Sequence, residues 1–312
     1  MKNKHDKKKK LNIWLKVSLI LVSILICILV IGTISIYNTL GKIEQVSVDT
    51  SDLNINYEEI EEFENHEEII NIALFGIDST EGVTGRSDAI MVATIDPIHN
   101  KLKLTSIMRD SYVNIPDIGM DKINHAYAFG GPQLAIKTIN ENFGLDITDY
   151  VSVNFTSLPI IIDILDGVDI DITEEEVPHI PGISYAGTHN LTGDQALSYS
   201  RIRYASGGDY MRTQRQRTVL NALFNKLSSL SVTDFTGLLN EVLPYVQTSM
   251  KPSDIITLGT KALGSISNGL SQDRFPRDGY CEGTMINDVY YLAFDLSTAK
   301  EQMMSYIFDD IK

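Results

Sequence analysis

The chain has 312 residues, 43% of them hydrophobic, and a formal net charge of −15 that conceals two oppositely charged parts. The first 36 residues carry seven lysines and one aspartate, so the other 276 carry 19 basic and 40 acidic groups, a net of −21. Such an acidic part excludes a nucleic-acid-binding surface, which needs a basic footprint against the phosphate backbone. We therefore expect no nucleic-acid partner and no DNA-binding regulator.

An uncharged apolar segment occupies residues 17–37, directly after the lysine-rich residues 1–16. At about 1.5 Å per residue this helix would span roughly 31 Å, close to the ~30 Å hydrocarbon core of a bilayer. A cleaved signal peptide has a shorter apolar region and a small-residue cleavage site, and no such site follows here. The pattern favours a single uncleaved membrane span with a cytoplasmic N-terminus, which places the rest of the chain outside the cell.

Residues 38–69 are acidic and only weakly apolar, which predicts an extracellular linker, either a solvated stalk or a short exposed helix. Residues 70–312 are numerous enough for one large domain. Cys27 lies in the predicted span and Cys281 is alone outside it, so we expect no internal disulfide.

Strand and helix patterns alternate along residues 70–312. The apolar run at 69–78 is typical of a buried strand, and residues 87–96 and 101–110 predict a hairpin with Pro and Asn in its turn. Residues 125–144 predict a helix in two pieces, broken at Gly130-Gly131-Pro132 and stopped by Gly144.

The later segments continue the alternation. We expect strands at 150–155 and 168–173, and helices at 157–167, 192–200, 210–230, 234–246 and from about 288 to the end. This order predicts an α/β fold, a layered α-β-α domain with a central mixed sheet, preceded by one N-terminal transmembrane helix.

Residues 199–217 hold five of the nine arginines of the chain, namely Arg201, Arg203, Arg212, Arg215 and Arg217. Local positive charge on an acidic background favours a small anionic ligand. Arg201 and Arg203 are one residue apart, so in an extended segment both point to one side and suit phosphate oxygens. Two salt bridges on an edge strand would explain the same spacing.

On a helical wheel, the apolar face that begins at Val219 continues backwards to Gln216, Arg212 and Asp209. Arg212 therefore lies on the core side, where a guanidinium needs an anionic partner, either a ligand or Asp209. The same wheel turns Gln214 away from the core and leaves Arg215 and Arg217 on the flanks, where a solvated position is the ordinary outcome.

A second group of charged residues follows the first strand. Asp78 ends that strand, Asp88 begins the next, and Arg86 lies between them. Two carboxylates with few other ligands suit Mg²⁺, which keeps several waters and shares phosphate oxygens. A loop cap at Asp78 and an ion pair between Asp88 and Arg86 would be the structural alternative. No phosphate-binding loop of the Walker type is present.

Six ordered segments resemble the LytR-CpsA-Psr family over roughly residues 70–230. They are "GIDS", "GRSDAIMVATIDP", "LTSIMRDSYVNIP", "KINHAYAFGG", "LTGDQALSYSRIRY" and the spacing of Asp209, Arg212, Arg215 and Gln216. Two departures are visible. Met108 stands before Arg109 where the family usually has Pro, and Asp166-Gly167-Val168 stands where Gly-Gly-Val is common.

The resemblance implies a membrane-anchored, extracellular, Mg²⁺-dependent phosphotransferase. Such an enzyme moves a teichoic acid, capsular or other secondary wall polymer from undecaprenyl pyrophosphate to a peptidoglycan hydroxyl, making a phosphodiester. Its prenyl tail would need an apolar tunnel, which we expect beneath the sheet along residues 157–167 and 218–227, although ordinary core packing explains these segments equally.

The resemblance also carries over site residues by position. Mg²⁺, with Mn²⁺ as the alternative, is expected at Asp78 and Asp88. Catalysis is expected from Arg109, Asp110, Arg201 and Arg203, and pyrophosphate binding from Arg86, Arg109, Lys122, Arg201, Arg203, Arg212 and Gln216. Asp110 and Asp209 are expected to orient arginines.

Two other functions compete with transfer. One is a regulatory module that binds polyprenyl pyrophosphate without turnover, and the other is a hydrolase that cleaves the pyrophosphate with water. Both carboxylates are present, which favours an enzyme over a binder. The sequence leaves open the polymer and the general base, for which Asp78 and Asp88 are candidates.

Overall fold

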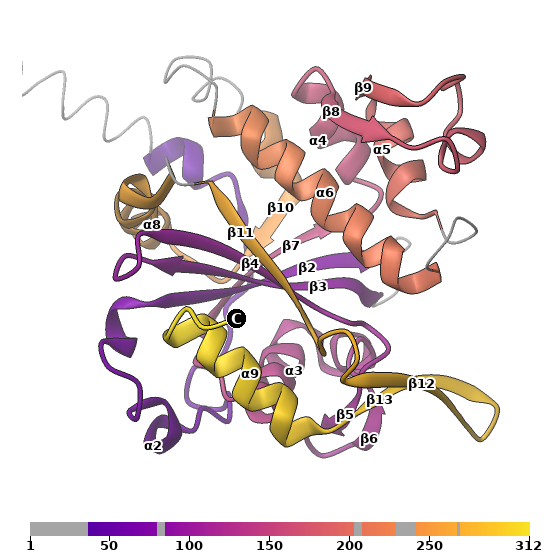
Figure 1. Cartoon of the computed structure of the whole chain (residues 1–312). Coiled ribbons are helices and arrows are strands. Elements are labelled where there is room, and N and C mark those ends of the chain that lie inside the picture. Colours follow the sequence, from indigo (N-terminus) through magenta and orange to yellow (C-terminus); the bar gives the residue numbers. More distant parts are fainter. Residues whose placement is uncertain (1–36, 80–84, 203–207, 229–240, 267–268) are drawn as a thin grey trace, which may run out of the picture.

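The structure is a computed structural model that describes residues 37–79, 85–202, 208–228, 241–266 and 269–312 (Figure 1). A seven-stranded sheet forms its centre, in the order β1-β10-β7-β2-β3-β4-β11. The strands are β1 (Glu44–Gln45), β10 (Val246–Thr248), β7 (Asp149–Asn154), β2 (Ile70–Asp78), β3 (Arg86–Asp96), β4 (Lys101–Ile107) and β11 (Leu270–Phe275). Parallel pairs (β2 with β7, β4 with β11) and antiparallel pairs (β2 with β3, β3 with β4) coexist, so the predicted mixed sheet is confirmed.

Helices lie on both sides of the sheet, as the predicted α-β-α layering requires (Figure 1). One side holds α3 (His125–Phe143) and α9 (Leu296–Phe308), and the other holds α4 (Leu158–Ile164), α5 (Gly193–Ser200) and α6 (Gly208–Ser228). Side chains alternate along a strand, so β2 serves both layers. Ala73 and Ile77 belong to the core that includes α3 and α9, whereas Leu74 lines a cavity on the α6 side.

The first half of the chain folds as its turn residues predict. Strands β3 and β4 form an antiparallel hairpin whose last pair is Asp96 with Lys101. Helix α3 is interrupted by non-helical backbone at Gly130 and Gly131, and it ends at Gly144, whose φ of 67° is left-handed. A positive φ costs glycine little, which explains why the break and the stop were readable from sequence.

Three two-stranded sheets and smaller helices complete the fold. The sheets pair β5 (Tyr112–Ile115) with β6 (Gly119–Lys122), β8 (Val168–Ile172) with β9 (Gly187–Leu191), and β12 (Cys281–Ile286) with β13 (Val289–Phe294). Further helices within the described ranges include α2 (Tyr57–Ile60), α8 (Pro252–Ile266) and the 3₁₀ turns η1 (His66–Glu68), η2 (Val177–His179) and η3 (Leu243–Tyr245). Within the described ranges, Cys281 is the free cysteine.

Two helix predictions near the C-terminus need correction. The helix expected from about residue 288 begins only at Leu296, because the preceding β-branched and aromatic run forms β13, and Asp295 caps the helix by accepting from the Thr298 N–H at 2.7 Å. Of the helix expected at 234–246, residues 234–240 lie outside the described part. Residues 241–242 are helical as predicted, whereas the rest forms the 3₁₀ turn at Pro244 and the start of β10.

The segment 38–69, predicted to be a solvated stalk or a short exposed helix, contains the short helix α2, but it packs into the domain and is not a solvated stalk. Strand β1 joins the central sheet beside β10, and Leu53 and Ile60 are 1% and 0% exposed in the core. Each such burial stabilises the fold by roughly 1.5–3 kcal/mol. The acidic residues around them stay on the surface, so composition alone concealed a segment that belongs to the domain.

The membrane span predicted at residues 17–37 lies outside the described part except for Tyr37. Among the residues that the structure describes, no helix combines the length and apolarity needed to cross a bilayer.

Candidate active site

A polar hollow of about 210 Å³ lies where strands β2 and β3 meet helices α5 and α6. Its lining consists of Asp78, Asp88, Phe155, Arg201, Arg212 and Gln216. Five of these six were predicted site residues, although they are spread over nearly 140 positions of the sequence. The antiparallel pairing of β2 with β3 explains the first two, because it places the end of one strand beside the start of the next.

Asp88 is the most constrained carboxylate of the hollow. It is 8% exposed, its Oδ2 lies 2.5 Å from Arg109 Nη1, and its Oδ1 accepts from Asn124 Nδ2 at 3.1 Å. A buried carboxylate needs such donors, because an unpaired charge away from water is costly. The structural alternative, an ion pair of Asp88 with Arg86, is thus not the pairing observed, because Asp88 pairs with Arg109.

Arg109 starts a chain of ion pairs that leads away from the hollow. Its Nε lies 3.3 Å from Asp110 Oδ2, and Asp110 Oδ1 accepts from Lys122 Nζ at 2.7 Å. Asp110 is 6% exposed, so it holds both cations in a largely desolvated position. This geometry suits the orienting role expected of Asp110, and it connects Lys122 to Asp88 through two intermediates.

Not every predicted site residue lines the hollow. Arg86 is exposed and is the backbone partner of Asp78 in the strand ladder, which leaves it at the rim. Asp78 is also exposed, unlike Asp88. Arg203 and the side chain of Asp209 lie outside the described part of the chain, so the choice between a ligand and Asp209 as the partner of Arg212 stays open.

Arg201 meets an aromatic ring at the mouth of the hollow. It caps the end of α5 with φ −99° and ψ −3°, so the extended conformation predicted for it is wrong. Its guanidinium carbon lies 5.6 Å from the centroid of Phe155, a distance at which a cation and a ring attract. Gly76 leaves room for that ring, because a Cβ there would lie 3.2 Å from Phe155 Cε1.

Helix α6 presents Arg212 and Gln216 to the hollow, as the helical wheel predicts, and they are 3% and 9% exposed. The same wheel is wrong for Arg215 and Arg217, which are 3% and 7% exposed. Arg215 Nε pairs with Glu176 Oε1 at 2.7 Å, because the segment between β8 and β9 covers that flank of the helix. A helical wheel shows the faces of one helix only, so it does not predict burial by another segment of the chain.

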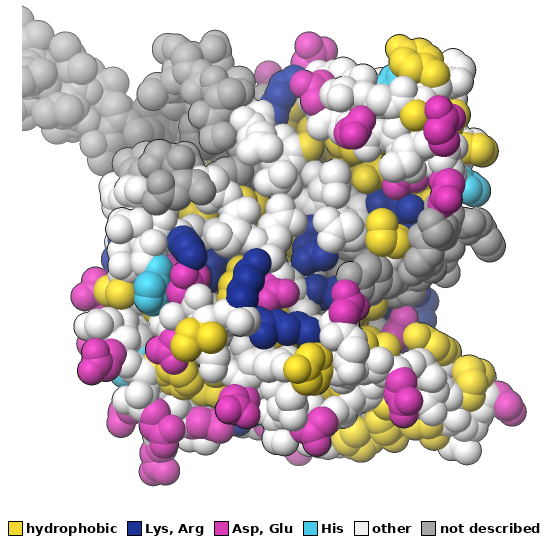
Figure 2. All heavy atoms as spheres, viewed as in Figure 1, with side chains coloured by type: hydrophobic (Ala, Val, Ile, Leu, Met, Phe, Trp, Pro, Cys, Tyr) yellow, Lys and Arg dark blue, Asp and Glu magenta, His cyan; other side chains and the backbone are white. Residues whose placement is uncertain are grey.

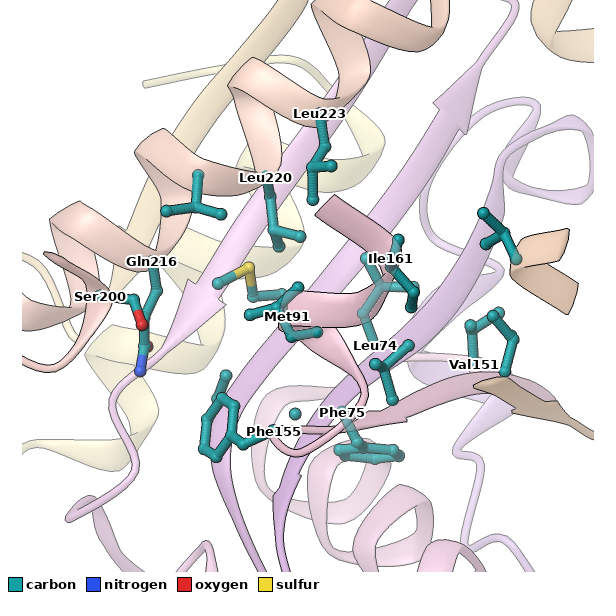
Figure 3. A pocket seen from close by; sticks show the side chains of 17 residues that line it. Leu74, Phe75, Met91, Val151, Phe155, Ile161, Ser200, Gln216, Leu220 and Leu223 are labelled. Atoms are coloured by element: carbon teal, nitrogen blue, oxygen red, sulfur yellow. The ribbon is translucent and has the colours of Figure 1, made fainter. Parts of the chain in front are cut away.

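An apolar cavity of about 240 Å³ adjoins the hollow on the α6 side of the sheet (Figure 3). Its floor comes from β2, β3 and β7, and its walls from α4 and α6; among the residues labelled in Figure 3 are Leu74, Met91, Val151, Ile161, Leu220 and Leu223. Phe155 and Gln216 line both spaces. The tunnel expected along residues 157–167 and 218–227 thus has a matching cavity at the expected place.

Two residues of the site were missed as candidates. Phe155 follows β7 and looked like the last residue of a buried strand. Asn124 precedes α3 at a position where Asn usually caps the helix, yet its side chain makes no cap hydrogen bond and donates to Asp88 instead. An Asn before a helix does not by itself indicate a site residue, because helix capping explains its presence equally well.

The two carboxylates of the hollow suit Mg²⁺, which needs few protein ligands, and do not suit a metal that is enclosed by protein ligands alone. Within the described ranges, no group of three or more His, Cys, Asp or Glu residues is placed to hold a metal. Mg²⁺ is commonly held by one or two carboxylates plus substrate phosphates and water. Asp78 is exposed to solvent, and each oxygen of Asp88 keeps a second lone pair beyond its hydrogen bond.

The fold and the site define an α/β protein that combines an arginine-lined hollow with an adjoining apolar cavity. Residues 31–306 match the LytR_cpsA_psr family model, and the chain belongs to that family. It is 33% identical over 306 residues to the polyisoprenyl-teichoic acid–peptidoglycan teichoic acid transferase TagU of Oceanobacillus iheyensis, covering 93% of this chain and 91% of TagU.

Other relatives extend the comparison. The chain is 36% identical over 193 residues to the regulatory protein MsrR of Staphylococcus aureus, covering 61% of this chain and 59% of MsrR. Among solved structures, TagT of B. subtilis superposes with a TM-score of 0.66 at 27% identity, over 84% of this chain and 99% of TagT. A structure of TagT with bound octaprenyl pyrophosphate lipid superposes with a TM-score of 0.64 at 26% identity and the same coverage.

Proposed function

We propose that this protein is a phosphotransferase that moves a glycopolymer from a polyprenyl pyrophosphate carrier to a peptidoglycan hydroxyl. The observation that carries the proposal is the junction of the two spaces, because Phe155 and Gln216 line both the charged hollow and the apolar cavity. A lipid pyrophosphate likewise consists of a charged head group joined directly to an apolar chain. The name of TagU and the lipid bound to TagT support this substrate class.

The arginines supply the contacts for the pyrophosphate. Arg201 and Arg212 line the hollow, and a planar guanidinium can donate two hydrogen bonds to phosphate oxygens at once. Gln216 adds an amide donor between head and tail. Arg86 at the rim and Arg203 complete the expected set, while Arg109 and Lys122 act from behind Asp88 and Asp110.

Asp78 and Asp88 would hold Mg²⁺, with Mn²⁺ as the alternative. When bound, the ion would neutralise charge on the pyrophosphate oxygens. Arg109 and Asn124 fix the Asp88 carboxylate in place, so this ligand is oriented before any substrate arrives. Preorganised charge of this kind is the main protein contribution to phosphoryl transfer.

The transfer step exchanges one phosphorus–oxygen bond for another. The acceptor hydroxyl oxygen bonds to the phosphorus that carries the glycan, and the bond from that phosphorus to the prenyl phosphate breaks. The electron pair leaves with the prenyl phosphate, whose charge Arg201 and Arg212 neutralise. Of the two carboxylates, Asp78 is the better candidate to take the hydroxyl proton, on a carboxylate oxygen that the metal ion would leave free, because both oxygens of Asp88 already accept hydrogen bonds.

We further propose that the reaction takes place at the outer face of the cell membrane, with the domain anchored by residues 17–37. The seven lysines before that segment favour a cytoplasmic N-terminus. An outward-facing domain has access to lipid carriers at the bilayer surface and to peptidoglycan.

A lipid-binding regulator is the second candidate, and the name of MsrR favours it. Such a module needs the arginines and the apolar cavity but has no use for two carboxylates in the hollow. Turnover separates the two functions. The purified full-length chain is incubated in detergent with a prenyl pyrophosphate-linked glycan, peptidoglycan strands and Mg²⁺. Glycan bound covalently to the strands supports transfer, and tight lipid binding without product supports the regulator.

A further inference from the structure

A second polar cavity, of about 350 Å³, lies on the other flank of helix α6. Its charged lining consists of Arg217 from α6 and of Asp273, Arg274, Arg277 and Asp278 from the end of β11 and the turn after it. Three guanidiniums face two carboxylates, so the walls carry a net positive charge in a strongly acidic part of the chain. Figure 2 shows Lys and Arg side chains gathered at the centre of this face, where β11 passes between α6 and α9.

The arginines of this second cavity are held firmly. Arg217 and Arg274 are 7% and 6% exposed, and Arg277 lies over the ring of Phe275 with 4.8 Å between its guanidinium carbon and the centroid. Arg277 Nη2 also pairs with Asp273 Oδ2 at 2.8 Å. A guanidinium fixed in this way loses little freedom when it binds an anion, which favours binding.

One of the two carboxylates is easily replaced. Asp278 pairs with Arg274, but 67% of its side chain is exposed. The Arg274 guanidinium is buried and needs an anionic partner, whereas the Asp278 carboxylate is open to solvent and can return to water when another anion takes its place. An incoming carboxylate or phosphate could therefore take the place of Asp278 beside Arg274 without a large loss.

The second cavity is linked to the hollow through Met108. Arg274 Nη1 lies 3.6 Å from Met108 Sδ, and the Met108 N–H donates to the Phe275 carbonyl at 3.0 Å. Met108 directly precedes Arg109, which holds Asp88. Proline, the usual residue of the family at this position, has no N–H and would lack this hydrogen bond to β11. The departure noted in the sequence thus joins the strand that carries Arg274 to the residue beside the site.

We propose that the second cavity is a subsite for an anionic group, a carboxylate or a phosphate, on a substrate chain whose reacting group lies in the hollow. This inference rests on the proposed function for the identity of that chain. A carboxylate would come from the stem peptides of the peptidoglycan acceptor, and a phosphate from the repeat units of the donor polymer. Helix α6 carries Arg212 and Gln216 to one space and Arg217 to the other, so a chain passing its end could reach both.

Direct binding tests this subsite without requiring turnover. Three probes are titrated into the full-length chain in detergent: a short peptidoglycan strand with free peptide carboxylates, the same strand with amidated carboxyls, and a glycerol phosphate oligomer. We expect Arg274→Gln to weaken the binding of one of the two anionic probes at least about tenfold and to leave the binding of the amidated strand unchanged. Which anionic probe responds identifies the source of the anion. The control is Lys137→Gln, which removes a cation on α3 that pairs with Asp52. This variant should bind all three probes like the wild-type chain.

Asp278→Asn separates a binding role from a merely structural one. Asp278 competes with the incoming anion for Arg274, so its removal should strengthen the binding of the anionic probe that responds to Arg274→Gln by a few-fold. A purely structural role of the arginine cluster does not predict this gain. Equal weakening of charged and amidated strands by Arg274→Gln, or no gain from Asp278→Asn, would overturn the subsite. Failure of transfer in the wild-type chain would count against the proposed function alone, because these titrations do not depend on it.

Discussion

Phe155 and Gln216 stand at the boundary between the charged hollow and the apolar cavity and line both. Phe155 directly follows β7 and Gln216 comes from the third turn of α6, so two distant segments create one junction. An amphiphile whose anionic head lies among Arg201 and Arg212 would pass its first apolar carbons between these two side chains. The proposed substrate class depends on this continuity more than on any single arginine.

Filling the apolar cavity should separate the contribution of the lipid tail to binding from that of the pyrophosphate head. Leu220 projects from α6 into the cavity (Figure 3), and Leu220→Trp would occupy space that a prenyl chain needs. Because burial is worth about 0.8 kcal/mol per CH₂, loss of even two buried groups weakens binding by roughly tenfold. Titration should show weaker prenyl pyrophosphate binding and unchanged inorganic pyrophosphate binding. Leu220→Met, which nearly conserves volume, is the matched control.

Truncation of the arginines should reveal whether they act on one group. We expect Arg201→Ala and Arg212→Ala each to weaken lipid pyrophosphate binding at least about tenfold, because a lost charge-assisted hydrogen bond costs about 1.5–3 kcal/mol. The double variant should lose less than the sum, as residues that bind one ligand do. Asn225→Ala, at an exposed position of the same helix, should bind like wild type.

Arg212 has a structural alternative that the same titration addresses. If Arg212→Ala binds normally but melts at a much lower temperature, the residue serves packing, and the pyrophosphate site must be built from the remaining arginines. A thermal midpoint close to that of wild type combined with weak binding would support the ligand role.

Asp88→Asn tests the metal and the preorganised carboxylate together. The amide retains one oxygen for Asn124 but removes the charge that faces Arg109 and a metal ion, so we expect the fold to persist and Mg²⁺-dependent transfer to be lost. Product formation against Mg²⁺ concentration, with thermal melting as the check on folding, measures both. Undiminished turnover of wild type in EDTA would remove the metal from the mechanism.

The topology prediction concerns residues outside the described part. We expect the lysine-rich N-terminus and the span predicted at 17–37 to place residues 38–312 outside the cell. Protease added to cells without a wall should then degrade the domain while cytoplasmic proteins survive. Protection of the domain under an active protease would reverse the orientation, and with it the access to peptidoglycan.

Local signals accounted for the elements that sequence predicted well. Gly144 needs a left-handed φ and ends α3, and the wheel of α6 placed Arg212 and Gln216 correctly. The misses depend on distant partners: Glu176 buries Arg215, and neighbouring helices bury Leu53 within an acidic segment. Charged residues signalled most of the site, whereas Phe155 and Asn124 carried signals that ordinary packing and helix capping explain equally.

The fate of one phosphorus atom tests transfer most directly. A prenyl pyrophosphate-linked glycan is labelled at the phosphate bonded to the sugar, then incubated with the full-length chain, Mg²⁺ and peptidoglycan strands. We predict that the label enters the strands as a phosphodiester that resists phosphomonoesterase, with one unlabelled prenyl phosphate released per link, and that Asp88→Asn abolishes both. Label recovered as a free glycan phosphate would show hydrolysis, and label that stays with the lipid in the wild-type protein would contradict catalysis.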